Sequence, residues 1–150
     1  MEVLIRNASS DDADVVMGLL KQLWPGRDLN EEKMTETFMD SLKRPEYYNF
    51  CAEVSGKVAA FCAGMSLNSL YNHGRICYLT TLIVDSEYRG CRIGSKMIER
   101  LKTYSLENDC LAIELDTALY RVDAHRFYER EGFVKRAFVY SQDVKRKEKI

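Results

Sequence analysis

Apolar residues along the first third of the chain recur at the spacing of amphipathic helices. The buried face expected for the first helix consists of Val15, Val16, Leu19, Leu20 and Leu23. The hydroxyl and carboxylate side chains of Ser9 to Asp12 are typical of a helix start, and Pro25 with Gly26 ends this helix. A second helix is expected from about Asn30 to Leu42.

β-Branched, aromatic and other apolar residues mark further segments that are expected to be strands. These segments are Val3–Arg6, Asn49–Val54, Val58–Leu67, Ile76–Val84, Leu111–Leu115 and Phe133–Tyr140. Helices are expected from Ile93 to about Asn108 and from Ala124 to Arg130, where Gly132 stops the second one. The order β-α-α-β-β-β-α-β-α-β predicts an α/β fold with a mixed sheet flanked by helices.

The length of 150 residues suits one domain over residues 1–150. The 22 basic residues are offset by 23 acidic ones, which leaves a net charge of −1. Because proteins held to nucleic acid through its phosphates carry a basic excess, we expect no nucleic-acid partner. The short basic tail from Lys145 to Lys149 is interpreted as a solvated end.

Cysteine usage and the amino-terminal sequence indicate a compartment. Five cysteines occur without any C-x-x-C spacing, which favours free thiols over a disulfide framework or a zinc site, and no metal is expected. The first residues lack the pattern of a signal peptide, and no apolar run approaches the roughly 20 residues of a spanning helix. We therefore expect a cytoplasmic protein without a membrane partner.

The stretch from Leu82 to Lys96 carries the strongest chemical signal. It reads as a strand, a glycine-containing loop and the start of an amphipathic helix. The first backbone N–H groups of such a helix are unpaired, and the helix dipole attracts negative charge, so the turn can bind a phosphate. Gly90 and Gly94 let an anion approach, and Arg89 and Arg92 add two cations. A structural role for the glycines alone, in a tight connection and close helix packing, is the alternative.

Two motifs in this half of the chain resemble the GCN5-related N-acetyltransferase (GNAT) family. Arg89-Gly90-Cys91-Arg92-Ile93-Gly94 is similar to the family's [RQ]-x-x-G-x-[GA] phosphate loop. Ala124 to Phe133 is similar to its A-x-x-[FL]-Y-E-x-x-G-F segment. The resemblance covers Val3 to Tyr140, by motif in the second half and by element order in the first. It implies a mostly antiparallel GNAT-like sheet and acetyl-CoA as the cosubstrate.

The resemblance also implies roles for particular residues. The coenzyme's pyrophosphate would lie on the N–H groups of Gly90, Cys91, Arg92, Ile93, Gly94 and Ser95, with Arg89 as a further coenzyme-binding residue at the rim of the loop. Its pantetheine arm would run along Leu82, Ile83 and Val84, and Arg121 falls near a coenzyme-contacting position of the family. Tyr128 would protonate the departing thiolate, unless it is only a core aromatic. The acceptor amine would attack the thioester directly in a ternary complex.

The sequence departs from the family pattern at two places. Arg92 stands where the family usually has its middle glycine, which is tolerable at negative φ and strained at positive φ. Thr80 and Thr81 stand where a carboxylate base is common, and threonine can at most hold a water. Glu114 and Asp116 are substitutes that surface positions explain equally well, so no general base is assigned. Cys91 is expected to be structural, since no histidine is placed to activate it.

The acceptor and the assembly are the least readable features. Leu23-Trp24-Pro25 and the segment after Asp116 resemble aminoglycoside 6'-N-acetyltransferases, which points to a small aminoglycoside- or polyamine-like amine. The acidic residues that would attract a polycation are Asp28, Glu31, Glu32 and Glu36, although they also suit a solvated helix face. A coenzyme A-binding sensor without catalysis and a peptide or protein N-acetyltransferase are the alternatives. The sequence does not determine the oligomeric state, and a homodimer stays open.

Overall fold

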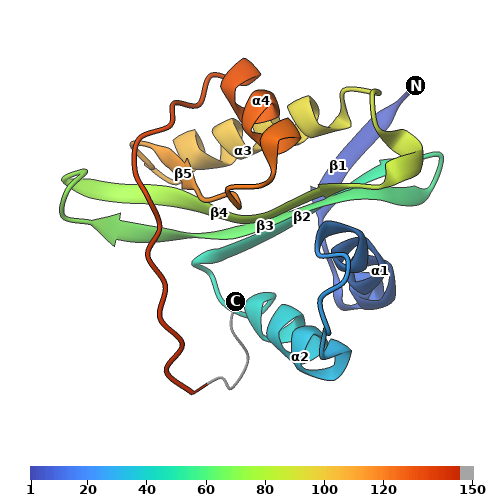
Figure 1. Ribbon diagram of the computed structural model, residues 1–150. Helices are drawn as coiled ribbons and strands as arrows, with labels where there is room; N and C mark the ends of the chain where they lie inside the picture. Colours follow the sequence, from blue (N-terminus) through green and yellow to red (C-terminus); the bar gives the residue numbers. More distant parts are fainter. Residues whose placement is uncertain (146–150) are drawn as a thin grey trace. The chain divides into compact units, whose positions relative to one another are not determined.

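A computed structural model describes residues 1–145, so most of the basic tail noted above, from residue 146 onward, lies outside the described residues. The described chain divides into two compact units, residues 1–115 and the part that begins at Asp116. The first unit holds a mixed sheet in the order β1-β2-β3-β4-β5 (Figure 1). Its strands are β1 (Val3–Asn7), β2 (Tyr47–Val54), β3 (Lys57–Ser69), β4 (Gly74–Val84) and β5 (Ile113–Leu115).

The sheet is antiparallel except at β5, which pairs in parallel with β4. The hairpin predicted between the second and third strands is confirmed. Val54 pairs with Lys57, and the two turn residues Ser55 and Gly56 both have positive φ, which matches the right-handed twist of the flanking strands. The GNAT-like mixed sheet expected from the motifs is therefore present.

Helices cover both faces of this sheet. On one side lie α1 (Ala13–Leu23), which follows the short 3₁₀ turn η1 (Ser10–Asp12), and α2 (Glu31–Ser41). The other side carries α3 (Ile93–Glu107), which follows the 3₁₀ turn η2 (Ser86–Tyr88) (Figure 1). Val16, Leu19, Leu20 and Leu23 of the predicted apolar stripe belong to the same core cluster as Phe61 of β3 and Ile83 of β4. The expectation for Val15 is wrong, because it is 38% exposed, and Met17 is buried instead. Across the sheet, Met97, Ile98 and Leu101 of α3 are fully buried.

The second unit contains α4 (Val122–Arg130) and an extended segment. The strand predicted over Phe133–Tyr140 is wrong: within residues 1–145, these positions carry no strand pairing. Strand character depends on a neighbour's hydrogen bonds as well as on composition, and here the side chains are mostly exposed. The predicted Leu111–Leu115 strand is shortened to Ile113–Leu115.

Candidate active site

The N-terminus of α3 is built to leave amide donors open. The first intrahelical bond runs from Lys96 N to Arg92 O at 3.2 Å, so the amides of Ile93, Gly94 and Ser95 precede the helical ladder. Within residues 1–145, no side chain caps this end, and its first turn carries no carboxylate. By contrast, Asn30 accepts a hydrogen bond from Lys33 N at the start of α2, where Glu31 and Glu32 follow. The α3 terminus therefore suits an anion from outside the chain.

The loop before α3 has a left-handed backbone at two positions. Gly90 has φ +80°, and an added Cβ there would meet nothing within 4 Å. The glycine therefore allows the left-handed backbone and leaves room for a ligand to approach, and close packing does not require it. Arg92 has φ 62° and ψ 20°. A left-handed conformation costs a residue with a Cβ about 1 kcal/mol. The loop thus holds residue 92 at a positive φ, a conformation in which an arginine is strained.

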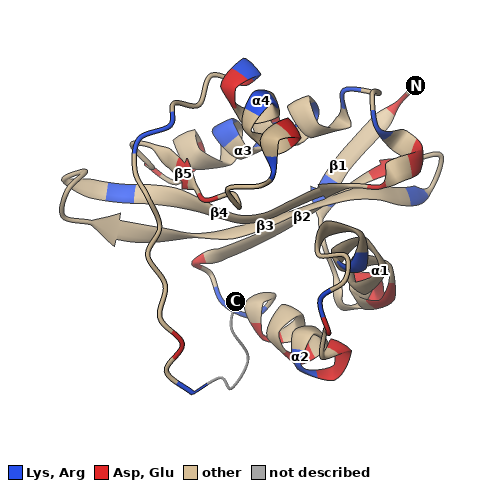
Figure 2. Cartoon of the chain, in the orientation of Figure 1, with Lys and Arg blue, Asp and Glu red and all other residues tan. Residues whose placement is uncertain are grey.

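Two exposed arginines line this strained loop. Arg89 and Arg92 are both exposed, and Figure 2 shows the loop leading into α3 in blue at its basic positions. Ile93, 1% exposed, anchors the start of α3 in the core. The loop therefore presents two cations and a row of amides on a firmly held base.

The entry to the loop is fixed by hydrogen bonds from several elements. Asp85 N donates to Ala59 O at 2.8 Å, and Asp85 Oδ1 accepts from Glu87 N at 3.0 Å. Ser86 N donates to Gln22 Oε1 of α1 at 3.0 Å. Gln22 was missed by the sequence reasoning, because a contact 64 positions away leaves no local signal. These bonds position the loop relative to the end of β4.

The second half of β4 offers an open strand edge. β4 and β5 pair only from Cys77↔Ile113 to Leu79↔Leu115. On its other side, β4 continues to pair with β3 up to Val84. Among residues 1–145, no strand pairs with the β5-facing edge of Leu82–Val84. An extended ligand could add to that edge through main-chain hydrogen bonds.

A β-bulge in β4 lies where the pairing of β4 with β5 ends. Ala63 pairs with Thr81 and Gly64 with Leu79, so Thr80 is the extra residue of β4. Thr80 is exposed, and its Oγ1 donates to Ala63 O at 3.0 Å and lies 3.4 Å from Thr81 Oγ1. Glu114 lies half-buried on β5, opposite Tyr78. A hydroxyl pair at the bulge can hold a water, but it is no base.

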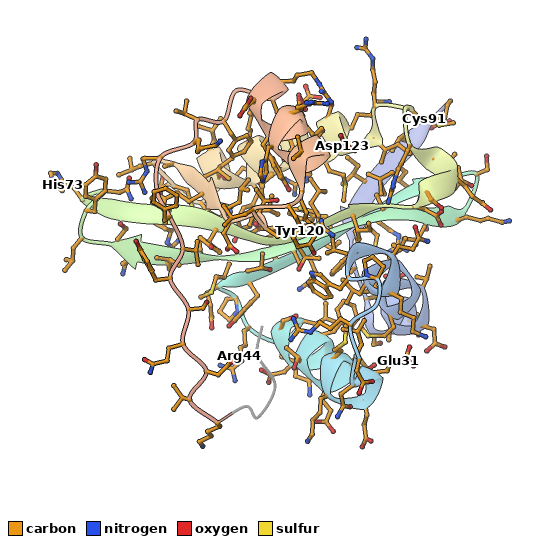
Figure 3. All side chains as sticks on the ribbon, viewed as in Figure 1. Glu31, Arg44, His73, Cys91, Tyr120 and Asp123 are labelled. Atoms are coloured by element: carbon orange, nitrogen blue, oxygen red, sulfur yellow. The ribbon has the colours of Figure 1, made fainter. Side chains whose placement is uncertain are left out.

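Cys91 is half-buried in the loop, and its Sγ lies 4.0 Å from Arg89 O; Figure 3 labels it there. The core cysteines are unreactive, since burial raises the pKa of Cys51 to about 12 and raises that of Cys62 further from its ordinary range. All five cysteines are free. Among residues 1–145, no cluster of histidine, cysteine or carboxylate side chains is arranged to hold a metal ion.

The remaining predicted site residues belong to the second unit. Tyr128 of α4 is half-buried between Phe127 and Phe133, with ring centroids at 5.2 and 5.6 Å. Arg121 is the half-buried N-cap of the same helix. His125 of the same helix is half-buried, with its Nε2 2.9 Å from Ala118 O. The first unit thus brings Leu82–Val84 and residues 89–95 together, while Tyr128 and Arg121 share α4.

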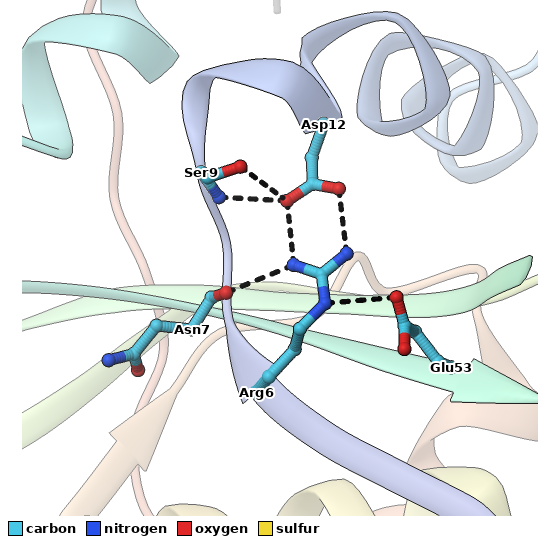
Figure 4. A network of polar contacts seen from close by, with 5 residues as sticks. All are labelled: Arg6, Asn7, Ser9, Asp12 and Glu53. Carbon is cyan, nitrogen blue, oxygen red and sulfur yellow. Dashed lines mark hydrogen bonds and ion pairs between the residues drawn. The ribbon is translucent and has the colours of Figure 1, made fainter. Parts of the chain in front are cut away.

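An ion-pair network that the sequence analysis did not predict links β1, β2 and the start of α1 (Figure 4). Arg6 of β1 donates to both carboxylate oxygens of Asp12 at 2.8 Å and to Glu53 of β2 at 3.0 Å. Asp12 Oδ2 also accepts from Ser9 N at 2.8 Å. The Arg6 hydrogen bonds lower the pKa of Asp12 and raise that of Arg6. This network joins the sheet to the start of α1, far from the phosphate loop in sequence.

Known proteins match this arrangement. The sequence model of the acetyltransferase (GNAT) family matches residues 15–133, which includes the loop, β4 and α4. The chain belongs to the GNAT acetyltransferase family. It is therefore an acyltransferase by family, and GNAT acetyltransferases use acetyl-CoA.

The most similar curated relatives include named N-acetyltransferases. The aminoalkylphosphonate N-acetyltransferase of Salmonella typhimurium is 27% identical over 138 residues, which are 92% of this chain and 89% of the relative. The glucosamine 6-phosphate N-acetyltransferase of Arabidopsis thaliana is 27% identical over 137 residues, 89% of this GNAT chain and 90% of the relative.

Solved structures share the fold at lower identity. The Arabidopsis thaliana glucosamine-6-phosphate N-acetyltransferase structure has a TM-score of 0.79 at 24% identity and covers 95% of this chain and 99% of its own. An aminoglycoside N-acetyltransferase solved in complex with CoA has a TM-score of 0.82 at 17% identity, over 96% and 95%. Among residues 1–145, no helix has the length and apolar character needed to cross a bilayer.

Proposed function

We propose that this GNAT protein transfers the acetyl group of acetyl-CoA to the primary amine of a small molecule. The observation that carries the proposal is the uncapped α3 terminus, with its left-handed loop and two exposed arginines, beside an open β4 edge. Within residues 1–145, no side chain caps the α3 terminus and no strand pairs with this edge of β4. Together these features suit a ligand with a diphosphate and an extended arm.

The residues of the first unit fit this cosubstrate. The amides of Gly90 to Ser95 would bind the diphosphate, with the guanidinium groups of Arg89 and Arg92 at its rim. The main chain of Leu82, Ile83 and Val84 would bind the pantetheine amides as a strand binds its neighbour. Arg121, at the N-cap of α4, is proposed as a further coenzyme contact. Because the family match runs from residue 15 to 133 across both units, we propose that they act as one domain.

The chemistry requires one proton removed and one proton delivered. Acetyl-CoA supplies an activated acyl group as a thioester, and the acceptor nitrogen bonds to its carbonyl carbon while the C–S bond breaks. A main-chain N–H near Val84 would stabilise negative charge on the carbonyl oxygen. The Tyr128 hydroxyl would donate its proton to the departing sulfur. The proton lost by the amine passes to solvent, with Thr80 and Thr81 able to hold the water.

The charge pattern of α2 bears on the acceptor. Of the four acidic residues considered for binding a polycation, Glu31 pairs with Lys21 at 2.8 Å and Glu36 with Lys33 at 3.4 Å. The label at Glu31 in Figure 3 marks this helix start. Two nearby lysines therefore offset part of the acidic charge. The named relatives act on amines that carry a phosphonate or a phosphate, so such amines belong in the acceptor panel beside aminoglycosides.

The test combines binding and turnover. Acetyl-CoA should raise the thermal unfolding midpoint, because a ligand that binds only the native state stabilises it. Release of free CoA thiol is then measured against aminoglycosides, polyamines, aminoalkylphosphonates, amino-sugar phosphates and short peptides. Turnover with a small amine supports the proposal. Binding without turnover on any amine would favour a sensor, turnover on peptides alone a peptide acetyltransferase, and an unchanged midpoint would contradict the coenzyme site.

A further inference from the structure

An open groove lies between the beginning of β2 and the second half of α3, within the first unit. Strand β1 stops at Asn7, which pairs with Phe50, so no strand among residues 1–145 pairs with the outer edge of residues 47–49. The groove has a volume of about 440 Å³, a size typical of small-ligand sites. Its walls come from β2 and α3, with contributions from the ends of β1 and α2.

Arg100 of α3 supplies the positive charge of this groove. Its guanidinium carbon lies 4.5 Å from the centroid of the Phe50 ring, which holds the group against the sheet by a cation–π contact. Its Nη1 is buried and, among residues 1–145, has no hydrogen-bond partner. None of the ion pairs formed within this part of the chain includes Arg100. Because a buried charged donor without a partner is unfavourable and rare, a ligand that accepts its hydrogen bond would offset this cost.

Aromatic side chains form much of the remaining wall. The ring of Tyr104, one turn after Arg100 on α3, has its centroid 4.8 Å from that of Tyr48 and 5.8 Å from that of Phe50. The Tyr48 hydroxyl donates to Tyr78 O at 3.0 Å, which fixes this ring. Burial raises the pKa of both Tyr48 and Tyr104, so neither phenol is charged at neutral pH. The groove therefore places one cation beside firmly held aromatic rings, which suit an aromatic ligand.

The charge of the groove selects the kind of anion. Of the residues that line it, only Arg100 and the exposed Glu107 are charged. A carboxylate with one negative charge can pair with a guanidinium through two parallel hydrogen bonds. A phosphate dianion would be repelled by Glu107 and would find no second cation in the lining.

We propose that this groove binds a small aromatic monocarboxylate, with Arg100 pairing with its carboxylate group and the aromatic wall contacting its ring. The site uses none of the residues to which acetyl transfer is assigned above. It therefore goes beyond the proposed function and does not depend on it.

The first experiment uses benzoate as the probe. Titration of the ¹⁵N-labelled protein, followed by amide NMR, should give saturable shifts at Phe50, Arg100 and Tyr104, with a Kd on the order of 1 mM or below. Benzamide has nearly the same shape without the charge, and phenyl phosphate carries a second negative charge, so each should bind there at least about tenfold more weakly. Shifts confined to residues 93–95 would show an adventitious anion at the start of α3 and would overturn the proposal. Equal binding of the three compounds, or no saturable shift, would overturn it as well.

The second experiment separates a ligand-binding Arg100 from one that serves only the fold. Arg100→Met keeps an unbranched side chain over Phe50 and removes the guanidinium, so it should weaken benzoate binding at least about tenfold. Its thermal unfolding midpoint without benzoate should equal or exceed that of the wild type, because an unpaired buried charge has been removed. Lys102→Met, at an exposed position of the same helix, should bind benzoate like the wild type. Benzoate binding retained by Arg100→Met, or a lower midpoint of this variant, would overturn the proposal.

Discussion

Arg92 combines an unfavourable backbone with an exposed charge. Its φ of 62° lies in the region that glycine adopts freely, yet the chain places an arginine there. The sequence identifies the position by its motif. It does not determine the sign of φ, which the turn from η2 into α3 imposes. Strain at a ligand-binding loop is consistent with a cation retained for the coenzyme phosphates.

Replacing Arg92 should therefore separate stability from binding. Arg92→Gly relieves about 1 kcal/mol of strain and should raise the unfolding midpoint by about 2–4 °C. It should also weaken CoA binding by roughly three- to tenfold, the size expected for one exposed charge-assisted contact. Calorimetric titration and thermal melts measure both effects.

Arg92→Ala is the matched control for this substitution, since it removes the charge and keeps the Cβ. It should lose affinity to the same extent without the gain in stability. If Arg92→Gly binds CoA as tightly as the wild type, Arg92 has no role in coenzyme binding.

Tyr128 is proposed as the proton donor, and its hydroxyl can be removed with little change in packing. Tyr128→Phe keeps the ring contacts with Phe127 and Phe133. It should lower kcat by about a hundredfold or more and leave CoA affinity unchanged, because general acid catalysis acts in the transition state. Steady-state kinetics at saturating substrates measures this. Tyr120→Phe, at a 79% exposed position, should be unaffected, and near-normal turnover of Tyr128→Phe would remove the proposed role.

Secondary structure elements with a periodic apolar face were predictable to within one or two residues. The third helix was expected from Ile93 to about Asn108 and runs to Glu107, because its buried residues recur on one side. The sequence wrongly predicts a strand over Phe133–Tyr140, because a strand needs a neighbouring strand and composition cannot identify one. Pairings across the chain, such as Arg6 with Asp12 and Glu53, depend on sheet register and were equally hidden.

A close approach between strands β2, β3 and β4 makes Gly64 irreplaceable. A Cβ at this position would clash with the carbonyl oxygen of Tyr78 and the hydroxyl of Tyr48, which are hydrogen-bonded at 3.0 Å. Gly64→Ala should destabilise the protein by about 3 kcal/mol, since neither neighbour can move freely in the core. Urea unfolding provides the measurement.

Gly18→Ala is the opposite case within α1, where an added Cβ meets nothing within 4 Å. It should stabilise by up to about 1 kcal/mol through helix propensity. Equal stability of the two variants would contradict the packing assigned to Gly64.

The Arg6–Asp12 pair should give the fold a defined acid sensitivity. Because the pKa of Asp12 is lowered in the folded state, its stabilisation is present at neutral pH and is lost as pH falls below about 4, toward that lowered value. Asp12→Asn should cost about 2–3 kcal/mol at pH 7 and flatten the fall in stability that the wild-type protein shows as the pH drops below about 4. Denaturant unfolding across pH tests this. Asp11→Asn, at an exposed neighbour, should retain the wild-type profile.

At the scale of the whole molecule, family membership was readable because two motifs carry it independently. The phosphate loop lies in the first unit and the Ala124–Phe133 segment in the second, and the family match spans both. The acceptor was not readable, since the acidic residues of α2 are partly offset by lysines and Thr80 and Thr81 replace the carboxylate common in the family.

The proposed function requires that the free amides at the start of α3 bind the coenzyme's diphosphate. Titrating ¹⁵N-labelled protein with CoA, and following its amide resonances by NMR, tests this residue by residue. Saturable shifts are expected at Gly90, Ile93, Gly94 and Ser95, with little change at the capped start of α2. Saturable CoA binding that leaves these four amides unmoved, or no binding at all, would contradict it.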